Sequence, residues 1–101
     1  MNMIFVNVIK SYRDVVAICD KELLGKKFEE GKFQLDVKEN FYKGELVSEE
    51  EAIKISESFS KEDSTFNIVG ENSIKVALKT RMIEKEDVGE VEGIPFALVL
   101  L

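Results

Sequence analysis

The chain contains no histidine, and this absence excludes many familiar catalytic and metal sites. None of its 101 residues is histidine, and only Cys19 is a cysteine. Without histidine there is no Ser–His or Cys–His nucleophile pair, no histidine-ligated zinc and no ordinary general base for neutral pH. Glu, Lys or Tyr can replace it only where burial shifts their pKa values, which a sequence does not show. We therefore assign no catalytic residue and expect no cofactor; whether the protein is an enzyme stays open, and a non-catalytic role is favoured.

A single cysteine also excludes an internal disulfide and a cysteine metal cluster. Cys19 stands inside an apolar stretch, where a small buried hydrophobic residue is expected rather than a reactive thiolate. The acidic runs 49–51 and 84–87 lack the alternating spacing of a calcium loop. We interpret them as a helix cap and a solvated linker, and we predict no metal site.

Proline and glycine are scarce, with one Pro and six Gly, which argues against disorder or low complexity. Apolar residues make up 45% of the chain, enough for one core at this length. We therefore predict a single globular domain, residues 1–101. The apolar N-terminus is too short to cross a bilayer and has no basic segment before it, so a cytoplasmic location is expected.

Positive charge is short in the second half of the chain. Lys and Arg number 14 against 20 Asp and Glu, for a net charge of −6. Residues 1–43 carry a net of +1 and residues 44–101 a net of −7. Proteins bind nucleic acids through clustered Lys and Arg, which neutralise the phosphates. The second half of this chain lacks such a cluster, so direct binding of nucleic acid is disfavoured. The acidic half suits a basic protein or ribonucleoprotein partner instead. The one basic concentration, where RNA binding would have to occur, is interrupted by three glutamates and comprises Lys21, Lys26, Lys27 and Lys32.

Apolar patterning in the first half predicts strands. The runs Met3–Ile9 and Val15–Cys19, joined by a short polar link, are typical of a β-hairpin. Asp20 is expected to cap the short helical turn that follows it. Residues 33–37 alternate strictly, which predicts a half-exposed strand with Phe33, Leu35 and Val37 facing the core.

The second half adds two helices and more strands. Ser48 and Glu51 form a capping box, which predicts a helix to about Phe59. A strand at 65–69 leads into a second helix, from about 72 to 80, and two strands follow. Pro95 belongs at a strand start or an edge, because it cannot donate a ladder hydrogen bond. The predicted fold class is α+β, with a two-layer structure in which two main helices pack on one face of an open, mixed or mostly antiparallel sheet.

The stretch from Phe66 to Lys79, a strand, a glycine and a helix start, resembles segments that hold phosphate. Glu71 places a carboxylate where the anion would lie, and the lysine and extra glycines of a phosphate loop are missing. Asn72 or Ser73 is expected to cap the helix. A turn with a cap is the favoured interpretation, and a site for a polar ligand or a partner is the alternative.

A second bend lies at Gly93–Pro95. Phe96 and Leu98 share one face of the strand that follows, and core is favoured there over an exposed partner patch. A site is expected only where this bend and the turn at 67–72 lie together in space. The candidate binding residues are Asn67, Gly70, Glu71, Asn72, Gly93 and Pro95.

Several segments together resemble a known family, the archaeal domain-of-unknown-function family 424. They read VVAICDKELLGKKFEEGKFQLDV, FYKGELVSEEEA, NIVGENSIKVAL and GIPFA, and cover nearly the whole chain in order. The resemblance implies a small archaeal cytoplasmic protein with an α+β fold, and no established activity. The family pattern commonly has Arg after the Gly–Glu pair, where this chain has Asn72. It also has His and Gln in its final strand, where Phe96 and Leu98 stand here.

Three functions follow as hypotheses. The first is a non-catalytic binding module for a basic protein or ribonucleoprotein. The second is a ligand-binding protein or small enzyme with a site between the two bends. The third is RNA binding through the basic concentration defined above.

Overall fold

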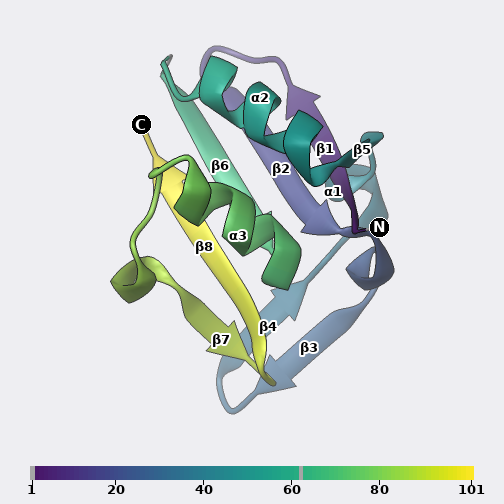
Figure 1. Ribbon diagram of the computed structural model, residues 1–101. Helices are drawn as coiled ribbons and strands as arrows, with labels where there is room; N and C mark the ends of the chain where they lie inside the picture. Colours follow the sequence, from purple (N-terminus) through teal and green to yellow (C-terminus); the bar gives the residue numbers. More distant parts are fainter. Residues whose placement is uncertain (1, 62) are drawn as a thin grey trace.

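A computed structural model describes residues 2–61 and 63–101 and shows an α+β fold (Figure 1). Its strands are β1 (Met3–Ile9), β2 (Asp14–Asp20), β3 (Lys27–Glu30), β4 (Phe33–Asp36), β5 (Glu45–Ser48), β6 (Ser64–Val69), β7 (Gly89–Val91) and β8 (Ile94–Leu100). Its helices are α1 (Glu39–Tyr42), α2 (Glu49–Phe59) and α3 (Glu71–Lys79), with 3-10 turns η1 (Lys21–Leu23) and η2 (Lys85–Asp87). No helix in the described ranges is long and apolar enough to cross a membrane.

The main sheet has six strands in the order β5-β1-β2-β6-β8-β7, and β3 and β4 form a separate pair. Strands β2 and β6 are parallel, whereas the other neighbours in the main sheet are antiparallel. The sheet is open and mixed, and the predicted β1–β2 hairpin is confirmed. The parallel pair matters for function, because parallel strands end at the same edge of a sheet.

One face of the main sheet packs against the two longer helices. In Figure 1, α2 and α3 lie in front of the strands. Along β2, every second residue (Val16, Ile18) points to this face, and apolar residues recur at helical spacing in α3, so side chains of both elements meet here. The buried cluster includes Ile4, Val6, Val16, Ile18, Phe66 and Ile68 from the strands, with Ala52, Ile74, Val76 and Ala77 from the helices.

A second apolar cluster lies on the opposite face. Ala17 and Cys19 alternate with Val16 and Ile18 along β2, so they point away from α2 and α3. Because this face also carries structure, the simple two-layer arrangement is not confirmed, although the α+β class is. The other buried residues of this cluster are Leu23 of η1, Val37 in the segment before α1, Tyr42 of α1 and Val69 of β6.

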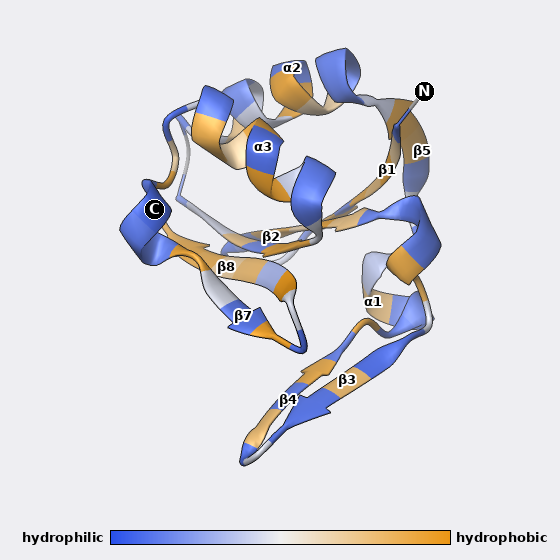
Figure 2. Cartoon of the chain, turned by 60° about the horizontal axis from the view of Figure 1, so that its bottom comes forward, coloured by the Kyte–Doolittle hydropathy of each residue, from blue (hydrophilic) through white to orange (hydrophobic). Residues whose placement is uncertain are grey.

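Strands β3 and β4 form an arm that extends away from the main sheet (Figure 2). The sequence prediction missed β3, together with α1 and β5, and it placed Phe33 wrongly in the core. Phe33 is 71% exposed, because it lies beside the two-residue turn at Gly31, at the end of the arm. Two hydrogen bonds hold the arm to the turn between β7 and β8: the backbone N–H of Glu29 donates to the Glu92 carboxylate at 2.7 Å, and that of Glu92 donates to the Glu30 carboxylate at 2.6 Å.

Two predicted helix caps were wrong and one is confirmed. Ser48 and Glu51 form the expected capping box at the start of α2. Neither Asn72 nor Ser73 caps α3, whose N-cap is Gly70 and carries no capping side chain of its own. Asp20 makes no side-chain capping bond to η1, because its carboxylate is used elsewhere.

Candidate functional site

Asp20 joins the end of β2 to the start of α3. Its carboxylate accepts four hydrogen bonds: from the backbone N–H groups of Asn72 (3.1 Å) and Ser73 (2.8 Å), the Asn72 side-chain amide (3.3 Å) and the Ser73 hydroxyl (2.7 Å). The side chain is only 2% exposed. The N-terminus of a helix attracts anions because its first N–H groups are unpaired and its dipole is positive there. In this protein that position is filled by the chain's own carboxylate.

Gly70 brings the two predicted bends together. Its backbone N–H donates to the carbonyl oxygen of Pro95 at 2.8 Å. Its φ of 110° lies in the region that favours glycine, and a Cβ there would overlap the Asp20 carboxylate. The turn at 67–72 and the bend at 93–95 are therefore neighbours in space, which is the condition that the sequence set for a site.

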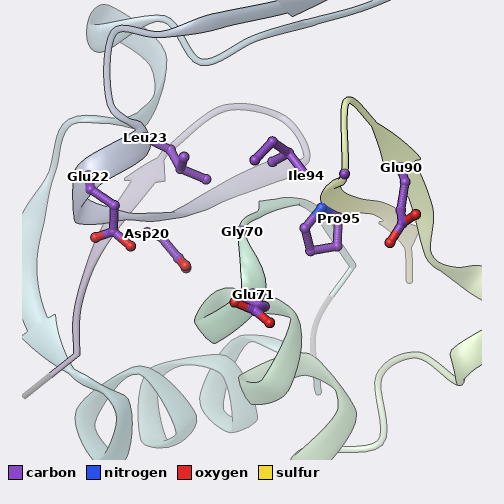
Figure 3. Close-up of a pocket in the computed structure, with 9 residues that line it drawn as sticks. Asp20, Glu22, Leu23, Gly70, Glu71, Glu90, Ile94 and Pro95 are labelled. Atoms are coloured by element: carbon purple, nitrogen blue, oxygen red, sulfur yellow. The ribbon is translucent and has the colours of Figure 1, made fainter. Parts of the chain in front are cut away.

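A cleft of about 300 Å³ opens between these segments (Figure 3). Glu22 lies on its η1 side, Glu90 on its β7 side, and Glu71 at the start of α3. These three side chains are exposed, and no ion pair among the described residues involves them. The remaining lining residues are Asp20, Leu23, Gly70, Gly93, Ile94 and Pro95, so the cleft has an acidic rim beside an apolar patch.

Four of the nine lining residues carry a carboxylate, and none carries a hydroxyl, thiol or amine. Within residues 2–61 and 63–101, no group of three or more His, Cys, Asp or Glu is arranged to hold a metal ion. Close by, burial and then the charge of Asp20 and Glu22 raise the pKa of Cys19 to about 12. Burial and then Cys19 raise the pKa of Tyr42 to about 12. Both groups are therefore neutral at ordinary pH.

Four of the six candidate residues, Gly70, Glu71, Gly93 and Pro95, line the cleft, and two do not. Asn72 donates to Asp20, and Asn67 lies in β6 opposite Leu98 of β8. The predicted core position of Leu98 was wrong, since it is 60% exposed. The sequence analysis did not predict five of the lining residues: Asp20, Glu22, Leu23, Glu90 and Ile94. The one available signal was Asp20, an acidic residue at the end of a buried strand, and it was assigned to the cap of the adjacent turn.

We expect Cys19 to resist alkylation in the folded protein. It is fully buried, and its raised pKa means that the folded state favours the neutral thiol. The resulting contribution to stability is complete below pH 9.0, the ordinary pKa, and is lost as the pH rises toward about 12. At pH 8.5, iodoacetamide followed by mass spectrometry should show no adduct in native buffer and one adduct in denaturant. An adduct formed in native buffer as fast as on a short unfolded peptide would contradict this environment.

Three comparisons place the chain among known proteins. The sequence model of a family described as "Protein of unknown function (DUF424)" matches residues 9–101. The comparison with curated proteins gave no match. Among solved structures, the crystal structure of an uncharacterized conserved protein from Methanopyrus kandleri is similar, with a TM-score of 0.82 and 24% identity over 97% of this chain and 92% of that one. At this identity the likeness shows a shared fold.

Proposed function

This chain belongs to the DUF424 family of proteins of unknown function, and from its own cleft we propose that it is a non-catalytic module that binds a basic partner. The partner is a protein or ribonucleoprotein, in the cytoplasm of an archaeon. The acidic rim of the cleft carries the proposal. Glu22, Glu71 and Glu90 surround a hollow that has no basic lining residue to neutralise them.

A Lys or Arg side chain fits both parts of this cleft. Such side chains lay their methylene groups on apolar surface and keep the charged end near water or carboxylates. Leu23, Ile94 and Pro95 supply the apolar surface, and the glutamates supply the charge. The surrounding negative charge of the second half steers a basic segment toward the cleft at low salt.

A second candidate is a small cationic ligand, such as a polyamine. The observation that favours it is that the two bends meet around a real hollow rather than on opposite sides of the molecule. A volume of about 300 Å³ is at the small end of the usual range for ligand pockets, so a single extended amine fits better than a larger molecule.

A titration with a lysine decapeptide at low salt tests the proposal. Backbone amide NMR signals of Gly70, Glu71, Gly93 and Ile94 should shift first and saturate. The double variant E71K/E90K should bind about tenfold more weakly or worse, because two attractive contacts become repulsive. The control E50K/E86K changes the net charge equally at exposed positions outside the cleft.

Equal weakening by the control, or shifts spread over the whole acidic surface, would show general charge attraction and defeat the proposed site. Spermidine that shifts the same amides at lower concentration than the peptide would favour the small-ligand candidate. A partner recovered from native lysate counts for the proposal only when E71K/E90K loses it and E50K/E86K retains it.

A further inference from the structure

Strand β1 has one edge that is only partly paired. Strand β2 covers Ile4–Ile9 on one side, whereas β5 covers only Met3–Val6 on the other. Beyond that point the chain leads back through Gly44 to α1. Within the described residues, positions 7–9 of β1 therefore have no strand partner on the β5 side.

The backbone direction along this open edge can be worked out. A Cβ on Gly44 would overlap the carbonyl oxygen of Val6, so that oxygen faces the β5 side. In a strand, backbone groups face the same edge at every second residue. The N–H and C=O groups of Val8 therefore face the open edge, whereas those of Asn7 and Ile9 face β2. Extending the strand by one residue would direct those of Lys10 to the open edge as well.

A groove of about 470 Å³ runs beside this edge, under α2. Glu45, the first residue of β5, lies at one end of this groove. At the other end of the open edge, the Nζ of Lys10 lies 5.0 Å from the centre of the Phe59 ring and 3.3 Å from a carboxylate oxygen of Asp14, with which it forms an exposed ion pair. The remaining groove residues are mostly apolar: Val6, Asn7, Val8, Gly44, Ile55 and Phe59.

We propose that the open edge of β1 pairs antiparallel with the same edge of a second copy of this chain. In a two-fold arrangement centred on Ile9, Val8 of each copy lies opposite Lys10 of the other. Each such pair exchanges two backbone hydrogen bonds, because both residues direct their backbone groups to this edge. The contact is self-complementary, as a two-fold interface must be.

Charge selects a second copy as the occupant. Lys10 of the second copy would lie beside Val8, in line with Glu45, which lies beside Val6. The side chains of Val6 and Val8 both point to the helix-covered face of the sheet. Their cross-strand neighbours, Glu45 and Lys10 of the second copy, would point to the same face, and they would be separated by two residue positions along the sheet edge. The symmetry repeats the Lys10–Glu45 contact on the other side. The dimer would also join two acidic clefts in one particle, which strengthens binding to a partner with several basic segments.

Sedimentation velocity at low salt, over protein concentrations from micromolar to millimolar, tests the pairing. The mass should rise from 11.5 kDa toward twice that value. The variants E45K and K10E should each weaken association about tenfold, because two attractive contacts become repulsive. The double variant K10E/E45K should recover association, since the charges are exchanged. E57K, with the same charge change on the exposed side of α2, should associate like the original chain.

Hydrogen exchange locates the contact. As concentration rises, the amides of Val8 and Lys10 should become protected, whereas those of Asn7 and Ile9, already directed at β2, should not change. A mass of 11.5 kDa at all concentrations would overturn the proposal. So would E45K and E57K behaving alike, or a double variant that does not recover association. Protection of the Val8 amide by a different protein, while this chain alone stays monomeric, would show that the edge pairs with a strand of that protein, and it would also overturn the proposal.

Discussion

The variant G70A is expected to lose about 3–5 kcal/mol of unfolding free energy, a large part of the 5–15 kcal/mol typical of a domain. Two costs combine at this position. An alanine must adopt a φ of 110°, which its Cβ opposes. That Cβ would also lie 2.6 Å from the Asp20 carboxylate oxygen Oδ1, where no tolerable contact exists. The carboxylate has to move, and its hydrogen bonds to α3 break.

Gly93 provides a matched control for this prediction. It also has a positive φ, 78°, but a Cβ there would meet nothing within 4 Å. G93A should therefore cost only the backbone strain, about 1–2 kcal/mol. Denaturant unfolding followed by circular dichroism gives both free energies. We expect the melting temperature of G70A to lie at least about 10 °C below that of the original chain. Equal losses of unfolding free energy in G70A and G93A would contradict the crowding of Gly70 against Asp20.

The sequence predicted those parts of the fold that depend on neighbours along the chain. The β1–β2 hairpin is specified by two apolar runs and a short polar link, and its pairing is confirmed. The Ser48–Glu51 capping box needs only residues three apart, and it is present. The strand start at Pro95 follows from its missing N–H, and Pro95 is the second residue of β8. In each case the energetic cause lies within a few residues.

The parts that were missed depend on distant partners. Strand β3 has one apolar residue among four, Phe28, and it exists because β4 pairs with it. Leu98 has a strand's apolar alternation, yet nothing in the described structure covers its face enough to bury it. No local pattern reveals which faces of a sheet are covered.

The candidate site shows the same division. The glycine turn and the bend at 93–95 were visible in the sequence, but the strand order that brings Glu22 and Glu90 beside Glu71 was not. Asp20 is the clearest case. It stands 52 residues before Asn72, and the parallel pairing of β2 with β6 makes them neighbours. Local capping rules assigned it to the next turn because they search only a few residues ahead.

The variant D20A is expected to lose about 3 kcal/mol of unfolding free energy. It removes the acceptor of four hydrogen bonds and leaves two backbone N–H groups of a buried helix start without a partner. Such groups cost more when orphaned than a hydrogen bond contributes when made. The control D36A removes an exposed carboxylate at the end of β4 and should change stability by less than about 0.5 kcal/mol. Similar losses in D20A and D36A would contradict the capping role.

An added carboxylate should partly restore D20A. The substitution leaves a small space at the positive end of α3, and formate has the size and charge of the group removed. Binding to the folded state alone raises its stability by mass action. The melting temperature of D20A should therefore rise with sodium formate more than with sodium chloride at equal ionic strength, whereas the original chain should respond to both salts equally. Equal responses in D20A would show that the helix start does not take an anion. A selective response would show that this turn is built as an anion site, with Asp20 as its permanent occupant.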